Sequence, residues 1–299
     1  MKRNRARRHY QAEGNEEVLE TGLLLQKMKS SAPHAIFASV CLALFCCLPC
    51  ALVHAQAQNA DPSRTIHVFL ALADNQHQGI IPVPPKLGNG DDPDRNLYWG
   101  AAYGVKTLFA HSADWQLLAA HQKPKPEVLE RCIFRHRTQN VYLVADAYQG
   151  RQIKQAIVDF LSAAAGQNPE ALAVQASSQA FTVHAGGSAN LVAYVGHEGL
   201  MDFSLPALPR RKDATHRDAM ILACISRSYF ATPLRTVGAQ PLVWTTGLIA
   251  PEAYTLKSAL DGWMLRETDD QIRERAAQAY SKYQHCSLAA ARRLLVTGW

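Results

Sequence analysis

The chain has 299 residues and a formal net charge of +6, and 48% of its residues are hydrophobic. Beyond residue 55 the balance is 24 basic against 21 acidic residues, which leaves no basic footprint for a nucleic acid. These 244 residues contain no repeat and no low-complexity stretch, and a domain of that size buries a large core without disulfide bonds. We therefore expect one domain over residues 56–299 and no nucleic-acid partner.

The segment before this domain has the features of an export signal. Residues 35–53 are apolar throughout, follow two nearby lysines and end in the small-residue pattern of a cleavage site. We expect residues 1–55 to be an N-terminal extension and signal peptide, with Met28 as an alternative start. The mature protein would then be periplasmic or secreted and free of the membrane. The alternative is an uncleaved anchor, because the 19 apolar residues nearly span a bilayer.

Three cysteines remain in the expected mature chain: Cys132, Cys224 and Cys286. An odd number leaves at least one thiol unpaired within the chain. A disulfide between Cys132 and Cys286 with Cys224 free is one possible pairing, and the sequence does not establish it.

Apolar runs alternate with helical patterns along the domain. Buried strands are expected at 66–73, 140–147, 191–195, 219–225 and 241–247. Helices are expected at 97–109, at 151–165 with Gly166 as the C-terminal cap, at 252–264, and from a capping-box pattern that opens at Thr268. Strands that alternate with helices predict an α/β fold, a three-layer αβα sandwich with a mostly parallel sheet.

Two reactive side chains stand at the ends of consecutive predicted strands. His197 follows the run LVAYV in Gly196-His197-Glu198-Gly199, and Cys224 closes the run AMILAC. Reacting groups in parallel sheets gather beyond the carboxyl ends of the strands. A histidine beside a cysteine generates or stabilises the thiolate that acts as a nucleophile. A buried cysteine alone is usually an apolar filler, so the matched placement of the two residues is what favours a site.

The motifs LVAYVGHEG and MILACIS resemble those of the caspase–legumain–gingipain superfamily of cysteine peptidases. In that superfamily one strand ends in a catalytic His followed by Gly, and a later strand ends in Ala-Cys. The order of elements over residues 64–265 is similar as well, including the opening strand IHVFLALA. Two features depart from the pattern: Glu198 separates His197 from Gly199, and the spacing of 27 residues between His197 and Cys224 is short.

The resemblance implies a caspase-like fold with assigned roles. His197 would be the general acid/base, Cys224 the nucleophile, and the backbone around Gly199 the donor to the oxyanion. Asp202 would be a third polar member of the site or, alternatively, an exposed turn residue.

The same resemblance implies substrate contacts on two loops. Thr245 and Thr246 lie at the end of the fifth strand, where relatives line the pocket for the side chain before the cleaved bond. Asp74 and Asn75 follow the first strand and would contact substrate or, alternatively, cap their own loop.

The spacing of the residues does not fit the metal-binding motifs of other protein classes. His197-Glu198 begins a zinc-protease HExxH pattern, but Met201 stands where the second histidine is needed. The acidic loop 91–94 lacks EF-hand spacing and is typical of a solvated loop. We expect no cofactor and no metal. The predicted function is an exported cysteine peptidase that hydrolyses a peptide or protein substrate through an acyl-enzyme, and the alternative is a noncatalytic peptide- or protein-binding protein on the same scaffold.

Overall fold

The computed structural model describes residues 63–176 and 179–299, which belong to one compact unit, Ala57–Trp299. The predicted signal peptide, or anchor, at residues 1–55 lies outside the described residues. Within the described ranges, no helix is both long and apolar enough to cross a membrane.

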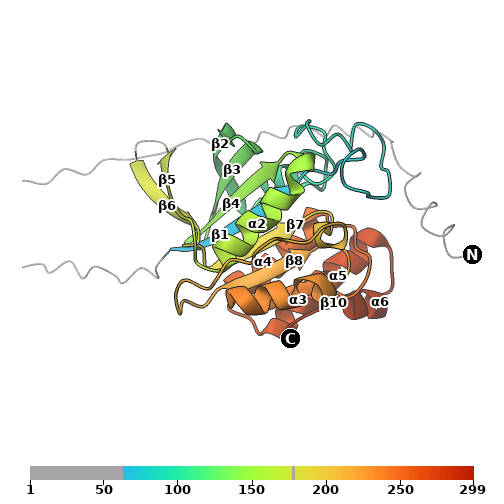
Figure 1. Cartoon of the computed structure of the whole chain (residues 1–299). Helices are drawn as coiled ribbons and strands as arrows, with labels where there is room; N and C mark the ends of the chain where they lie inside the picture. Colours follow the sequence, from blue (N-terminus) through green and yellow to red (C-terminus); the bar gives the residue numbers. More distant parts are fainter. Residues whose placement is uncertain (1–62, 177–178) are drawn as a thin grey trace, which may run out of the picture. The chain divides into compact units, whose positions relative to one another are not determined.

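An eight-stranded sheet forms the centre of this unit, in the order β10-β9-β8-β7-β1-β4-β3-β2 (Figure 1). Its inner strands are parallel: β1 (Arg64–Ala71), β4 (Val141–Tyr148), β7 (Leu191–Val195), β8 (Asp218–Leu222) and β9 (Gln240–Thr245). The outer strands are antiparallel to their neighbours: β2 (Trp115–Lys125), β3 (Val128–His136) and β10 (Leu295–Val296). The five parallel strands are those expected from the sequence, so the α/β class and the mostly parallel sheet are confirmed.

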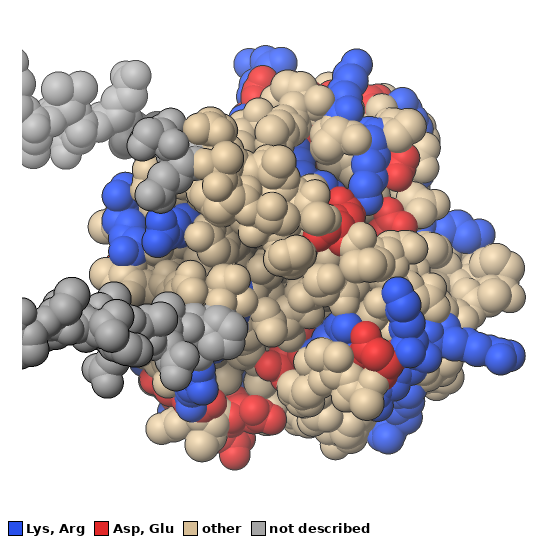
Figure 2. Space-filling model, turned by 90° about the vertical axis from the view of Figure 1, so that its left-hand side faces the viewer, with Lys and Arg blue, Asp and Glu red and all other residues tan. Residues whose placement is uncertain are grey.

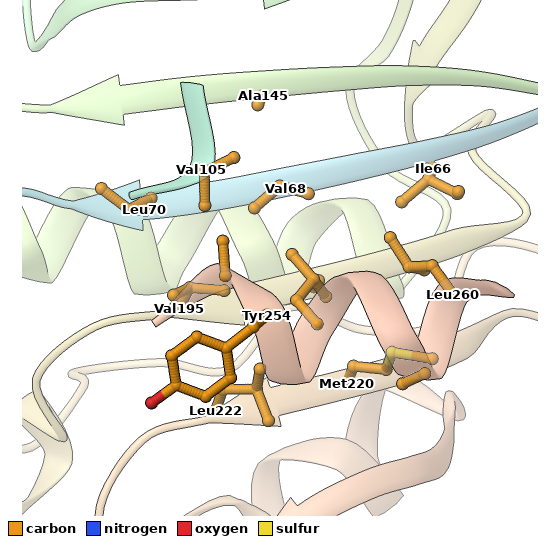
Figure 3. Close-up of a cluster of buried hydrophobic side chains, with 14 of the residues drawn as sticks. Ile66, Val68, Leu70, Val105, Ala145, Val195, Met220, Leu222, Tyr254 and Leu260 are labelled. Carbon is orange, nitrogen blue, oxygen red and sulfur yellow. The ribbon is translucent and has the colours of Figure 1, made fainter. Parts of the chain in front are cut away.

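Helices cover both faces of the sheet, which explains why the parallel strands are apolar on both sides. Ile66, Val68 and Leu70 of β1 join a core under α1 (Val105–Ala110), α4 (Ala253–Met264) and α5 (Asp269–Gln284). Figure 3 shows this core, with Tyr254 and Leu260 of α4 facing side chains from β1, β7 and β8. Phe69 and Ala71 point the other way, into a core under α2 (Ile153–Ala164) and α3 (Ser226–Val237). The arrangement is compatible with a three-layer α/β sandwich.

The helix caps were predicted well and one helix was not. Gly166 has φ of +79° beyond the end of α2, and Thr268 and Gln271 form the expected capping box of α5. The helix expected at 97–109 is instead a series of turns, with only α1 helical. A Cβ on Gly100 would meet backbone atoms of Asp94 at 2.1 Å, so the chain folds back here more closely than a helix allows.

Several elements had no sequence signal that we recognised. They are the β2–β3 hairpin, the separate hairpin of β5 (Pro169–Ala176) and β6 (Gln179–Gly186), the short 3₁₀ helices η2 (Gly150–Gln152) and η3 (Gly199–Met201), the helices α3 and α6 (Leu288–Leu294), and β10. The possible disulfide is absent as well, because Cys132, Cys224 and Cys286 are all free thiols.

Charges of both signs are distributed over the face drawn in Figure 2, with wide uncharged areas between them. No continuous basic surface lies on this face, in keeping with the nearly balanced charge of the domain sequence.

Candidate active site

The strand order creates one place where two connections diverge. From β1 the chain goes to the far edge of one side and returns through β2 and β3 to β4, and it later reaches β7 on the other side of β1. Open α/β sheets bind their ligands beyond the carboxyl ends of the strands at such a point. His197 follows β7 there, and Cys224 follows β8, the next strand along.

His197 is held by a carboxylate. Its Nε2 lies 2.6 Å from Oδ2 of Asp202, and the side chains are 12% and 51% exposed, respectively. Gly196, with φ of +143°, turns the chain out of the sheet just before the histidine. The hydroxyl of Tyr194 donates to the His197 carbonyl at 2.7 Å and fixes the backbone below the ring. Asp202 is therefore both the exposed turn residue and the polar partner that the sequence left as alternatives.

Cys224 lies on a strained turn between β8 and α3. The strand ends at Leu222, earlier than expected, because Ile225 adopts φ of +53° and α3 begins at Ser226. A β-branched residue rarely occupies this left-handed region, and such strain often accompanies functional sites. Hydrogen bonds hold the turn: the Ile225 N–H donates to the Gly247 carbonyl at 2.9 Å, and the Ser226 N–H donates to the Thr245 hydroxyl at 3.1 Å.

The register of the strands aligns the two candidate residues. Val195 of β7 pairs with Leu222 of β8, and His197 and Cys224 each follow two positions later. Neighbouring strands lie about 4.8 Å apart, so both residues leave the sheet at adjacent points of one edge.

In this structure the thiol and the imidazole bond to other groups. The Cys224 thiol donates to the Ile249 carbonyl at 3.7 Å, and no hydrogen bond joins it to His197 in the described part of the chain. Burial, followed by the nearby carboxyl of Glu198, raises the pKa of the Cys224 thiol. The resting cysteine is therefore protonated at neutral pH.

Glu198, between His197 and Gly199, is fully buried. Its Oε1 accepts from the Leu200 N–H at 3.3 Å, while Oε2 has no hydrogen-bond partner among the described residues. Burial raises the pKa of Glu198 to about 8, so the carboxyl is mostly neutral at pH 7. A carboxyl group kept neutral in this way can donate as well as accept a hydrogen bond.

The backbone N–H of Gly199 is not free to hold an oxyanion. It donates to the carbonyl of His197 at 3.0 Å inside the turn that leads into η3. A Cβ at this position would lie 2.7 Å from the ring of Phe203, so the glycine is needed for close packing. A role of Gly199 as an oxyanion donor would require its N–H to leave the His197 carbonyl, and it stays a prediction.

Thr245 and Thr246 are committed to structural contacts as well. Thr245 is fully buried, and its hydroxyl donates to the Ala223 carbonyl. The Thr246 hydroxyl donates to the Arg293 carbonyl at 2.6 Å. Both hydroxyls satisfy backbone carbonyls, and a substrate contact by either residue stays a prediction.

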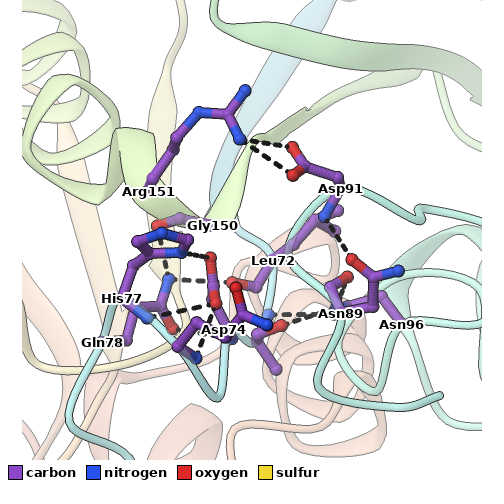
Figure 4. A network of polar contacts seen from close by, with 11 residues as sticks. Leu72, Asp74, His77, Gln78, Asn89, Asp91, Asn96, Gly150 and Arg151 are labelled. Atoms are coloured by element: carbon purple, nitrogen blue, oxygen red, sulfur yellow. Dashed lines mark hydrogen bonds and ion pairs between the residues drawn. The ribbon is translucent and has the colours of Figure 1, made fainter. Parts of the chain in front are cut away.

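Asp74 and Asn75 build the loop after β1, as Figure 4 shows for Asp74. The buried Asp74 carboxylate accepts from the backbone N–H groups of Gln76 and His77 at 2.9 and 3.2 Å. The Asn75 amide donates to the Val83 carbonyl at 2.8 Å and accepts from its N–H at 3.0 Å. Loop capping, the alternative given for both residues, is what the structure has.

His77 is the residue that sequence reasoning missed. Its Nδ1 lies 2.8 Å from Oδ2 of Asp74, and its side chain is 46% exposed. The available signal was the spacing Asp-x-x-His directly after a buried strand, which brings a carboxylate and an imidazole together within one turn.

Apolar side chains are exposed on three loops of the same edge. Ile81, Met201 and Leu248 follow β1, β7 and β9, and they are 71%, 43% and 66% exposed. Large exposed hydrophobic side chains gathered beside polar groups are typical of binding surfaces.

The acidic loop after β1 forms ion pairs. Asp91 bonds to Arg151 at 2.8 Å, and Asp92 bonds to Arg95 at the same distance. No cluster of three metal-ligating side chains occurs in the described ranges.

Comparisons with protein-family models, with curated proteins and with solved structures find no match for this chain.

Proposed function

We propose that this protein is an exported cysteine peptidase of caspase-like architecture. The observation that carries the proposal is the alignment of two strand ends. A carboxylate-held imidazole follows β7, and a thiol on a strained turn follows the in-register end of β8. A nucleophile, a base and a group that orients the base are the parts that covalent catalysis requires.

The Asp202–His197 bond favours this chemistry. With Nε2 bonded to Asp202, Nδ1 is the ring nitrogen left to act as a base. In the proposed reaction Nδ1 takes the proton from Cys224 as Sγ attacks the substrate carbonyl. The same nitrogen then delivers the proton to the leaving amine, and an acyl-enzyme remains.

The raised pKa of Cys224 is compatible with a thiol that ionises only during attack. Catalytic hydrogen bonds are often long or absent before substrate binds, so the Cys224–Ile249 bond describes the resting state. In the proposed reaction the thiol leaves the Ile249 carbonyl, a weak partner at 3.7 Å, when substrate binds.

A peptide substrate is favoured by the loops around the edge. The exposed side chains of Ile81, Met201 and Leu248, which follow β1, β7 and β9, offer apolar contacts. Peptide side chains bind such apolar positions, while the reacting backbone needs only the polar groups near Cys224.

A noncatalytic peptide- or protein-binding role is the second candidate, and specific observations favour it. The Gly199 N–H is already bonded, and the neutral carboxyl of Glu198 stands beside the thiol. In this role the apolar loops bind the peptide and Cys224 is a half-buried packing residue.

Acyl transfer separates the two candidates. The full-length protein is mixed with a library of short peptides and, separately, with p-nitrophenyl acetate, and each cysteine is analysed by mass spectrometry. A peptidase cleaves library members and acetylates Cys224 faster than Cys286, which is also half-buried and serves as an internal reference. Both reactions should be lost in Cys224→Ala and His197→Ala.

Equal acetylation of Cys224 and Cys286, with no cleaved peptide, would remove the peptidase proposal. Retention of apolar peptides by the same protein, lost in Leu248→Ser, would then establish the binding role.

A further inference from the structure

His77 presents one ring nitrogen outward from a rigid loop. Its Nδ1 bonds to the buried carboxylate of Asp74, which also accepts from two backbone N–H groups. A carboxylate so placed accepts a hydrogen bond from Nδ1–H, and in the neutral imidazole Nε2 is then the basic nitrogen. The ring is half exposed, and Nε2 has no hydrogen-bond partner in the described part of the chain.

The residues packed around Asp74 hold its side chain in one position. A Cβ on Gly90 or on Gly150 would lie 2.3 Å or 2.4 Å from Asp74 side-chain atoms, so only glycine fits at these positions. The Gln78 amide donates to the carbonyls of Leu72 and Gly150 at 2.8 Å and fastens the loop to the ends of β1 and β4. Figure 4 shows His77 above Asp74, with Gln78 and Gly150 around them. The imidazole is the exposed, reactive end of this rigid assembly.

The same loop reaches the His197–Asp202 pair. A Cβ added to Gly79, two residues after His77, would lie 4.0 Å from each carboxylate oxygen of Asp202. The loop after β1 and the turn after β7 therefore contact each other at the carboxyl edge of adjacent strands. Two carboxylate-held imidazoles border this edge, one on each loop.

We infer that His77 is the general base for the water that hydrolyses the acyl-enzyme, and that Asp74 is its positioning residue. This inference rests on the proposed function, because it assigns a role within the second half of that reaction. The two imidazoles then divide the chemistry: His197 serves Cys224 during acylation, and His77 serves water during deacylation.

The deacylation step is balanced in atoms and charge. Nε2 of His77 removes a proton from water while the water oxygen bonds to the acyl carbon. The bond between that carbon and Sγ of Cys224 breaks, and the thiolate receives the proton back from His77 through solvent. The products are the free carboxylic acid and the thiol, and the Asp74 carboxylate stabilises the imidazolium that forms in between.

The test separates acylation from deacylation with p-nitrophenyl acetate. The wild-type protein should release a burst of about one equivalent of p-nitrophenol and then turn over steadily. His77→Ala should keep the burst and lose about 10²-fold of the steady rate, because general base catalysis contributes about that factor. The acetyl thioester on Cys224 should then accumulate and be seen by mass spectrometry.

Two further variants guard against a structural effect. Asp74→Asn should slow deacylation in the same direction, because its amide donates to Nδ1 and leaves the proton on Nε2. His216→Ala is the matched control, because it removes a histidine bonded to Asp218 at 2.9 Å at the start of β8, the opposite edge of the sheet. Its burst and its steady rate should equal those of the wild type.

The outcomes distinguish the two proposals. Absence of a Cys224-dependent burst in the wild type would refute the peptidase proposal itself. A burst in both proteins with unchanged turnover in His77→Ala would refute only the role of His77. Loss of the burst in His77→Ala, with the protein still folded by circular dichroism, would also refute it, because His77 would then act before acylation.

Discussion

Two histidine–aspartate pairs of this sheet have the same chemistry and opposite surroundings. His67 and Asp146 lie on β1 and β4, 3.2 Å apart, and both are fully buried. His197 and Asp202 lie beyond β7, 2.6 Å apart, and the aspartate is half exposed.

In the buried His67–Asp146 pair, both ring nitrogens and both carboxylate oxygens have hydrogen-bond partners. His67 Nδ1 accepts from the Gly186 N–H at 2.9 Å, and Asp146 accepts two bonds from Arg131 at 2.5 and 2.6 Å. Burial alone would raise the pKa of Asp146, but the bonds from Arg131 and His67 outweigh it and hold the pKa well below its usual range. Arg131 also bonds to Glu170 of β5 at 2.7 Å, so the network fastens the β5–β6 hairpin to the sheet.

The His197–Asp202 pair at the edge leaves the second ring nitrogen of His197 without a side-chain partner among the described residues. In the described part of the chain, His197 has Asp202 as its side-chain partner and no cation beside it. The difference teaches that a histidine–aspartate pair is a candidate for chemistry when one ring nitrogen remains accessible. When every group is filled, the pair holds the fold together.

The largest effect expected at the edge is on activity. His197→Ala should lower kcat/KM for a cleaved peptide by about 10²–10⁴, because the base is lost. Its unfolding free energy should change by less than about 1 kcal/mol, because the partner is exposed. Steady-state kinetics and urea unfolding measure the two quantities, and a large loss of stability would place this pair in the same class as His67–Asp146.

The largest effect expected in the interior is on stability. Asp146→Ala leaves the Arg131 guanidinium buried and should cost about 3–5 kcal/mol of unfolding free energy. The depressed pKa of Asp146 contributes stability above the ordinary value of 3.8, and this stability is lost as the pH falls below it. Urea unfolding at pH 7 and pH 3 should therefore show a smaller acid loss in the variant than in the wild type. An equal acid loss would exclude Asp146 as its source.

A smaller effect is expected from Asp202→Asn. The amide keeps the shape of the side chain but weakens the orientation of His197, and the exposed position limits the loss to about tenfold in kcat/KM. The matched control is Asp218→Asn, which alters the His216 pair at the far edge. Activities that fall equally in both variants would show that the carboxylate of Asp202 has no special role.

The last prediction concerns Glu198, and it is a change of stability with pH rather than a loss at one pH. Its pKa is about 8 in the folded protein against an ordinary 4.5, so the folded state binds the proton more tightly. The unfolding free energy should therefore decrease with rising pH between these values, by up to about 1.4 kcal/mol per pH unit. Glu198→Gln should abolish that slope and, because the ionised carboxyl raises the thiol pKa, speed alkylation of Cys224 above pH 8. A slope that survives in Glu198→Gln would assign it to another group.

The sequence predicts the parallel sheet because uniformly apolar runs such as LVAYV have few other solutions. The β2–β3 hairpin escapes prediction because β2 is mostly exposed and its pattern is irregular. The positions of His197 and Cys224 at one edge follow from the parallel direction of their strands, but the pairing of β7 with β8 is a finding of the structure.

The partners within the site do not follow from strand order. The bond from His197 to Asp202 depends on the turn through η3, a loop conformation that no local pattern specifies. Thr245 was expected to contact substrate, yet it is fully buried and its hydroxyl accepts from the Ser226 N–H. Side-chain contacts of this kind depend on how separate loops meet, which is a tertiary property.

The backbone conformation of Ile225 strains the turn beside Cys224. An isoleucine in a left-handed backbone conformation costs on the order of 1–3 kcal/mol, and the surrounding contacts must supply that energy. If an adduct on the adjacent sulfur loosened those contacts, they would no longer offset the strain at Ile225. The first turn of α3 would then be less stable. We therefore expect modification of Cys224 to lower the thermal stability of α3.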